Sequence, residues 1–199
     1  TLKGEMGIPT VLSAPKWGYY DVLFNGNKFE FDRDYGTYVM ENILFKISYP
    51  AEFHAQTAVE AAVTLHPKVK DRLLDIKTIY VNTHESAIRI ISKKGPLANP
   101  ADRDHCLQYM IAVPLMTGNL TADHYEDSFH NNNSIIDVLR DKMVINEDKR
   151  YSADYLDPEK RSIANSIKIE FEDGSTTDEI EVEYPIGHKN RRKEGIPIL

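Results

Sequence analysis

Three titratable side chains in the middle of the chain have a spacing that suits one face of a helix. Asp102, His105 and Tyr109 are three and four residues apart, and residues at such intervals lie on the same side of a helix. Histidine moves protons near neutral pH, and tyrosine can donate a hydrogen bond or a proton, so this row could perform acid–base chemistry in a cleft. The structural alternative is a buried tyrosine with a satisfied hydroxyl and a histidine bonded to a helix cap.

A second candidate is the pair Lys46 and His54, which flank Tyr49-Pro50. A helix is predicted just after Pro50, and its positive end together with Lys46 would form a site for an anion. His54 falls on the packed side of that helix. The alternative is a lysine whose stem lies along apolar surface, with its charged head in water, and a core histidine.

Composition excludes several classes of function. The 199 residues carry a formal charge of −7, which disfavours a nucleic-acid partner, so the basic run 188–193 is interpreted as a solvated loop. No apolar run approaches the roughly 18 residues that cross a bilayer, so no membrane partner is expected. Cys106 is the single cysteine, which excludes a disulfide within the chain and the usual four-thiolate iron–sulfur cluster. No metal site is predicted.

The elements that would position these residues indicate an α+β fold. Helical patterns are expected at 51–66, where Pro67 ends the helix, and at 99–117, where Asn99 is the cap and Pro114 introduces a kink. Residues 86–92 are helical or extended. Strands are predicted at 76–82, 143–146, 166–172 and 178–184. In the third, Ile167, Ile169 and Phe171 alternate with charged residues, and a hairpin turn at Asp173-Gly174 joins it to the fourth. Together they predict a small, largely antiparallel sheet with helices on one face. Further helical pieces are expected at 121–127 and 134–141.

Residues 1–42 follow a different pattern. Glycines and prolines interrupt the segment and restrict it to short helices. Aromatic side chains are dense there, which indicates a surface that packs against another part of the protein. The chain starts without Met and ends on Ile196-Pro-Ile-Leu199, so we expect it to be a piece of a longer protein.

Four blocks of sequence, read together, resemble the MmgE/PrpD family, and most closely its members that dehydrate 2-methylcitrate. The resemblance covers nearly the whole chain. The blocks are FKISYPAEFHAQTAVEAA (45–62), THESAIRIISKKGPLANPADRDHCLQY (83–109), DPEKRSIAN (157–165) and YPIGHKNRRKEGIP (184–197).

This resemblance implies a domain organisation and a reaction. Residues 1–42 would end an N-terminal helical part, 43–190 would form an α+β lid domain, and 191–199 would begin the return to the helical domain. The active site would lie between the two domains. The family removes a proton next to a carboxylate and expels the β-hydroxyl from small polycarboxylates, which requires a base, an acid and cations.

The resemblance also assigns roles to residues. Lys46 matches a lid lysine of related decarboxylases, with a one-residue difference in its spacing to the proline, and is expected to bind substrate with Arg103. Tyr109 matches a site tyrosine and is expected to be catalytic, together with His54 and His105. His54 replaces a different residue in those decarboxylases, so it marks either the substrate class or nothing.

Further expectations follow from the family. The enzyme would need no cofactor and no iron–sulfur cluster. Its partners would be a tricarboxylate substrate, the missing helical domain of the same protein and a second copy in a homodimer. It would lie in the cytoplasm, or in the mitochondrial matrix of a eukaryote. The alternatives are another polycarboxylate lyase or epimerase of the family, resembling cis-aconitate decarboxylase, and a non-catalytic ligand-binding module with the lid fold.

Overall fold

A computed structural model describes residues 4, 7–31, 36, 43 and 46–195, and the predictions for the remaining positions lie outside it. The chain divides into two compact units, residues 1–42 and residues 43–199. In the first unit, the described residues form one short helix, α1 (Tyr19–Phe24), which ends at Asn25 in a left-handed conformation. Phe24 contacts the rings of Tyr19 and Phe29, while Trp17 is 85% exposed.

The second unit contains a four-stranded sheet in the order β2-β1-β3-β4. Its strands are β1 (Ile76–Thr83), β2 (Met143–Glu147), β3 (Asn165–Phe171) and β4 (Ile180–Val182). The pair β1–β3 is antiparallel, with Ile79 opposite Ile169, and β3–β4 is also antiparallel. The pair β1–β2 is parallel, with Ile79 opposite Met143. The predicted α+β fold with a largely antiparallel sheet is therefore confirmed.

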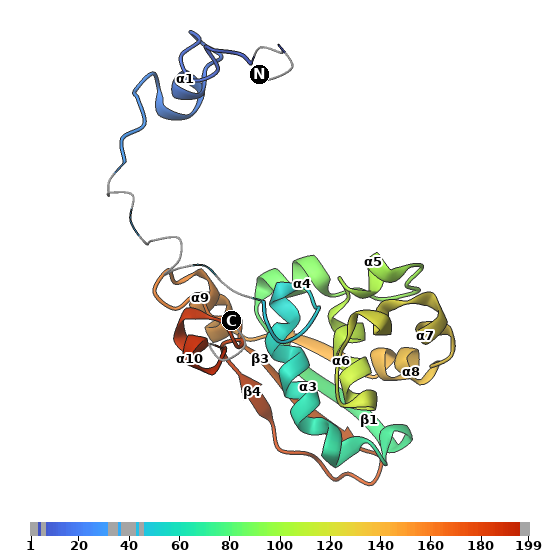
Figure 1. The fold of residues 1–199 in the computed structure, drawn as a ribbon. Helices are drawn as coiled ribbons and strands as arrows, with labels where there is room; N and C mark the ends of the chain where they lie inside the picture. Colours follow the sequence, from blue (N-terminus) through green and yellow to red (C-terminus); the bar gives the residue numbers. More distant parts are fainter. Residues whose placement is uncertain (1–3, 5–6, 32–35, 37–42, 44–45, 196–199) are drawn as a thin grey trace. The chain divides into compact units, whose positions relative to one another are not determined.

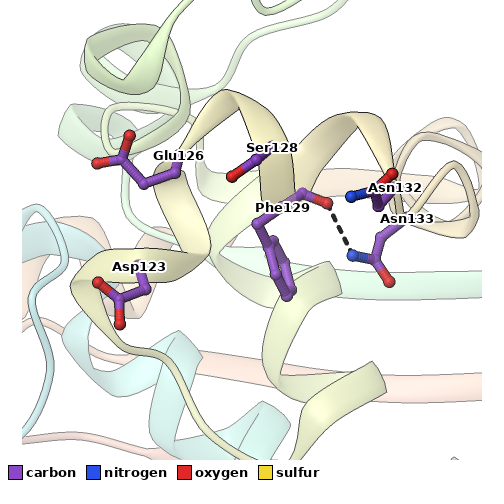
Figure 2. Close-up of a pocket in the computed structure, with 6 residues that line it drawn as sticks. All are labelled: Asp123, Glu126, Ser128, Phe129, Asn132 and Asn133. Atoms are coloured by element: carbon purple, nitrogen blue, oxygen red, sulfur yellow. Dashed lines mark hydrogen bonds between the residues drawn. The ribbon is translucent and has the colours of Figure 1, made fainter.

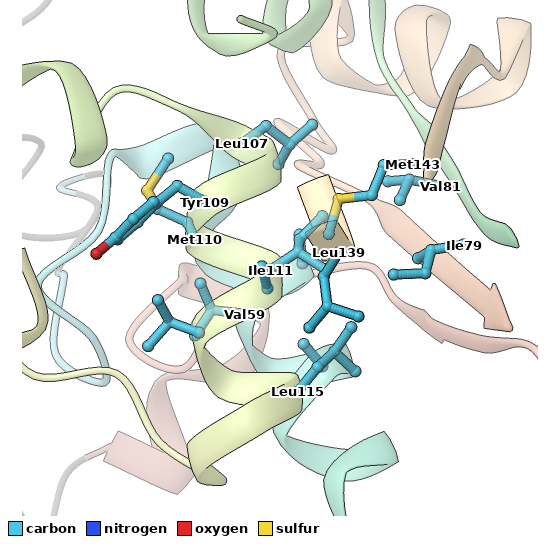
Figure 3. Close-up of a cluster of buried hydrophobic side chains, with 14 of the residues drawn as sticks. Val59, Ile79, Val81, Leu107, Tyr109, Met110, Ile111, Leu115, Leu139 and Met143 are labelled. Carbon is cyan, nitrogen blue, oxygen red and sulfur yellow. The ribbon is translucent and has the colours of Figure 1, made fainter. Parts of the chain in front are cut away.

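One face of the sheet is buried under helices. The helices α3 (Gln56–Val69), α6 (Leu107–Thr117) and α8 (Ile135–Asp141) share a single core with the sheet, and α3 lies against α6 (Figure 1). Figure 3 shows Ile79 and Val81 of the sheet together with Leu107, Ile111 and Leu139 of the helices. The buried alanines of α3 (Ala58, Ala61 and Ala62) have small side chains, which allows α6 to approach closely.

The opposite face of the sheet is polar. Lys77 pairs with Glu170 at 2.7 Å, and the Tyr80 hydroxyl donates to the same carboxylate at 2.9 Å. From Thr78 to Thr83 the side chains of β1 alternate between this face and the buried core, as expected for a sheet with one solvated face, and a register shift between Ile76 and Thr78 interrupts the alternation at Lys77.

Pro67 does not end α3, contrary to the prediction. A 3-10 turn, η1 (Phe53–Ala55), precedes this helix, which continues to Val69. Proline removes one backbone donor, but the next turn keeps its bond from the Lys70 amide to the His66 carbonyl at 2.9 Å. A proline in the last turn therefore costs a single hydrogen bond and leaves the helix end in place.

The prediction of a single helix at 99–117 is wrong, because the structure has two helices in this range. The predicted Asn99 cap is present, with its side chain accepting from the Asp102 amide, but α5 spans only Pro100–Arg103. The backbone is extended at Cys106 (φ −121°, ψ 107°), and α6 begins after it. Asp102, His105 and Tyr109 are therefore not one helical face.

The hairpin turns where the sequence predicts, but its second strand is shorter. Gly174 has φ +80° and its amide bonds to the Phe171 carbonyl, so Asp173-Gly174 forms the turn. Beyond an isolated bridge at Thr176, the ladder is interrupted until Ile180. The Thr177 hydroxyl accepts from the Ile169 amide at 3.1 Å and replaces a carbonyl as the acceptor.

The remaining elements connect and flank this core. Residues 86–92 are mostly helical, as α4, and residues 121–127 form a 3-10 turn and the start of a helix. These elements are η2 (Leu73–Asp75), α4 (Glu85–Ile91), η3 (Ala122–Tyr125), α7 (Asp127–Asn131), α9 (Lys149–Leu156), η4 (Lys189–Arg191) and α10 (Arg192–Gly195).

Candidate active site

One carboxylate and three aromatic or imidazole rings lie close together beside the start of α3. The Glu52 carboxylate caps η1, where it accepts from the His54 amide at 2.7 Å. The same carboxylate lies 2.8 Å from Nδ1 of the His54 ring. The short turn 52–54 therefore holds the carboxylate and imidazole of one acid–base pair, with side chains only 15% and 13% exposed.

The other nitrogen of His54 reaches a residue far along the chain. Its Nε2 lies 3.2 Å from the hydroxyl of Tyr155 in α9. The Tyr155 ring stacks on His84 at 4.6 Å, with 8° between the planes, and His84 lies 5.2 Å from the His54 ring. We call Glu52, His54, His84 and Tyr155 the histidine cluster.

Hydrogen bonding defines which nitrogens carry protons. An ionised Glu52 accepts from Nδ1–H of His54, which leaves Nε2 to interact with Tyr155. His84 accepts the Ala87 amide at Nδ1, which places its proton on Nε2. That Nε2 is buried and has no hydrogen-bond partner within the described part of the chain.

The electrostatics of the cluster favour one ionised carboxylate and one neutral histidine. Burial raises the pKa of Glu52, but hydrogen bonds from the His54 ring and from backbone amides outweigh it and hold the pKa below its ordinary value. Burial lowers the pKa of His84 to about 4, and the nearby His54 adds to this effect while Glu52 opposes it. His84 is therefore neutral at physiological pH.

Polar contacts from the sheet and from two helices fix the cluster in place. Asn165, at the start of β3, donates from its amide to the His54 carbonyl at 2.9 Å and to the Thr57 hydroxyl at 2.8 Å. The Ser152 hydroxyl accepts from the Glu85 amide at 2.9 Å, which joins α9 to the start of α4. His84 and Tyr155 lie on these two joined helices or at their ends.

Tyr109 and Arg103 lie in a different cluster. Tyr109 is fully buried in α6, and its hydroxyl donates to the His124 carbonyl at 2.7 Å. Burial raises the pKa of Tyr109 to about 12, while Arg103 opposes this shift. Arg103 is 2% exposed and donates to the Tyr125 carbonyl and to Asp127, each at 2.5 Å. In this conformation both side chains hold the η3–α7 segment against the core.

The other two predicted site residues are at the surface. His105 lies between α5 and α6, and its ring is 2.5 Å from the Asp104 carboxylate. Lys46 is exposed and forms no ion pair with another residue that the structure describes. The described contacts thus join His54 to neither Tyr109 nor His105, and the roles predicted for these residues stay predictions.

Three surface hollows lined by described residues contain no member of the histidine cluster. One, of about 430 Å³, is lined by residues of η3, α7 and the turn after it, and includes the carboxylates of Asp123 and Glu126 (Figure 2). The Asn133 amide donates there to the Phe129 carbonyl at 2.7 Å. No Lys or Arg is among the six lining residues, so this hollow does not suit a polycarboxylate.

Sequence reasoning found His54 but missed Glu52, His84 and Tyr155. Glu52 is two residues from His54. In a regular helix side chains at this spacing point in different directions, but the η1 turn brings these two together. His84 precedes α4 and Tyr155 lies in α9, and these two helices come together only in three dimensions, so no sequence motif relates the two residues. Among the described residues, no group of three or more His, Cys, Asp or Glu side chains is placed to hold a metal ion. The helices in the described ranges include none long and apolar enough to span a membrane.

Comparison with known proteins identifies the class. Residues 49–199 match the MmgE/PrpD C-terminal domain, so the chain belongs to the MmgE/PrpD family. It is 58% identical, over 98% of its length, to the 2-methylcitrate dehydratase of Escherichia coli (strain K12), of which it covers 41%. It is also 58% identical, over 99% of its length, to the mitochondrial 2-methylcitrate dehydratase of Yarrowia lipolytica, of which it covers 38%. The chain thus spans about two fifths of the length of these relatives.

Proposed function

We propose that the chain is the lid-containing part of an enzyme that eliminates water from 2-methylcitrate to give 2-methyl-cis-aconitate. The observation that carries this proposal is 58% identity over 98% of the chain to a 2-methylcitrate dehydratase. The reaction is proposed to need no cofactor. The single cysteine agrees with this for an iron–sulfur cluster, because one thiolate cannot hold the usual four-thiolate cluster by itself.

The histidine cluster supplies proton-transfer chemistry suited to this reaction. Elimination breaks a C–H bond next to a carboxylate and a C–O bond at the β-carbon, so one group takes a proton and another gives one to the leaving hydroxyl. His54, oriented by Glu52, is such a group. The exposed ammonium of Lys46, eight residues before His54, is the proposed cation for a substrate carboxylate.

The wider setting follows from the same resemblance. Besides the tricarboxylate substrate, the proposed partner is a helical domain of the same longer protein. That domain would close the site over the substrate and supply the remaining acid–base groups. A homodimer and a location in the cytoplasm, or in the mitochondrial matrix of a eukaryote, complete the proposal. The mitochondrial relative from Yarrowia lipolytica supports the second location.

The test is an assay of the full-length protein with 2-methylcitrate, citrate and cis-aconitate. Formation of a carbon–carbon double bond conjugated to a carboxylate gives an ultraviolet signal for dehydration. The proposal predicts the highest kcat/KM with 2-methylcitrate. Faster conversion of cis-aconitate would identify another polycarboxylate lyase of the family, and binding without turnover would identify a ligand-binding module.

A further inference from the structure

We infer that the Tyr155 hydroxyl is a catalytic acid that protonates the leaving hydroxyl of the substrate, with His54 and Glu52 behind it as a proton relay. This inference rests on the proposed function and extends it to residues outside the predicted site. The geometry that carries it is a continuous row: the Glu52 carboxylate 2.8 Å from His54 Nδ1, and His54 Nε2 3.2 Å from the Tyr155 oxygen.

One end of this row, the Tyr155 hydroxyl, can form a further hydrogen bond. Both Glu52 oxygens contact the His54 ring, and both ring nitrogens of His54 have partners. The Tyr155 hydroxyl is hydrogen-bonded only to His54 among the described residues, although an aromatic hydroxyl can both donate and accept. A substrate oxygen beside Tyr155 would therefore complete the row rather than displace one of its bonds.

The proton transfers balance along this row. The Tyr155 O–H proton passes to the substrate hydroxyl, whose C–O bond breaks so that water leaves with the bonding electron pair. The electron pair of the cleaved C–H bond forms the new double bond, and that proton goes to a base on the rest of the enzyme. In this sequence of transfers His54 starts as the imidazolium, with Nδ1–H bonded to the Glu52 carboxylate and Nε2–H bonded to the Tyr155 oxygen. When Tyr155 has given its proton away, Nε2 passes its own proton to the Tyr155 oxygen, and solvent then reprotonates the neutral imidazole.

His84 is a positioning residue in this arrangement. Its ring lies parallel to that of Tyr155 at 4.6 Å, which fixes the plane in which the hydroxyl lies. It is fully buried, and the Ala87 amide holds its Nδ1, so the ring cannot rotate without losing that bond. The buried Nε2–H of His84 has no hydrogen-bond partner among the described residues, and such an unsatisfied group lowers stability.

The test compares Tyr155→Phe with Tyr80→Phe in the full-length enzyme. Both changes remove one hydroxyl that is bonded to a titratable side chain, but Tyr80 lies on the polar face of the sheet beside Glu170. We expect Tyr155→Phe to lower kcat for 2-methylcitrate roughly a hundredfold, with KM changed less than about threefold, because a general acid acts in the transition state. Tyr80→Phe should retain wild-type kcat.

A second variant tests the relay itself. Glu52→Gln should also lower kcat, and the double variant Glu52→Gln/Tyr155→Phe should be no slower than the slower single variant, since members of one unit are not additive. Independent, multiplicative losses would overturn the relay, as would wild-type kcat in Tyr155→Phe. If the wild-type enzyme is inactive with 2-methylcitrate, the proposed function fails first and the assignment of Tyr155 fails with it.

Discussion

The Nε2 atom of His54 lies 3.2 Å from the Tyr155 hydroxyl, although 101 residues separate the two in the chain. His54 is held from the η1 turn and Tyr155 from α9, and the buried Asn165 of β3 bonds to the backbone of His54. This contact makes one acid–base cluster from three parts of the fold. No described contact joins this cluster to the buried residues around Tyr109, and the two groups of residues lead to different predictions.

Replacing Lys46 tests whether it binds a substrate carboxylate. In the full-length enzyme, Lys46→Ala should lower kcat/KM about ten- to a hundredfold, mainly through KM, because a charge-assisted contact contributes roughly 1.5–3 kcal/mol. Lys168→Ala is the matched control, because Lys168 is an exposed lysine of β3. Equal kinetics in the two variants would show that Lys46 is an ordinary surface lysine.

Replacing Tyr109 tests its predicted catalytic role against the structural one. Tyr109→Phe removes the hydroxyl that bonds to the His124 carbonyl and leaves that half-buried carbonyl without this donor. We expect the free energy of unfolding to fall by about 1 kcal/mol, with turnover nearly unchanged. Denaturant unfolding and steady-state kinetics on the same preparation measure both quantities. Unchanged stability with a large loss of turnover would restore the catalytic role.

The buried neutral His84 makes stability depend on pH in a defined direction. Its pKa falls from 6.5 to about 4 on folding. Between these values the unfolded chain binds a proton that the folded chain does not, so the contribution is complete above pH 6.5 and is lost as pH falls toward 4. Through this residue alone, the free energy of unfolding should drop by about 2 kcal/mol from pH 7 to pH 5.

The control for this pH effect is His84→Gln, whose side-chain oxygen can still accept the Ala87 amide. Denaturant unfolding of both proteins at several pH values gives the comparison. As pH falls, the free energy of unfolding of the wild type should decrease more than that of the variant. A constant difference from pH 7 to pH 5 would mean that His84 takes up a proton in the folded state.

Local patterns in the sequence predicted most of the fold. Alternation of Ile167, Ile169 and Phe171 with charged residues gave β3, and Asp173-Gly174 gave the turn, because both signals act over a few residues. The break between α5 and α6 could not be read in this way. Every residue from Leu107 to Leu115 is buried, so α6 has no polar face whose period would mark its start.

The site was less predictable than the fold. His54 was identifiable from its place beside a predicted helix start, but its partners depend on tertiary contacts. Tyr155 lies in α9, which is joined to the start of α4 by the bond from the Glu85 amide to Ser152. Regular spacing also gave a misleading signal, since Asp102, His105 and Tyr109 keep a helical interval across a segment that is not one helix.

The most direct measurement of the central claim is kcat for dehydration of 2-methylcitrate by full-length His54→Gln, with His66→Gln as the matched control. His66 lies near the end of α3, with Nδ1 3.0 Å from the Leu115 carbonyl and away from the histidine cluster. The account predicts that His54→Gln loses roughly a hundredfold in kcat while His66→Gln stays within about threefold of wild type. Wild-type kcat in His54→Gln, in a variant that folds normally, would contradict it.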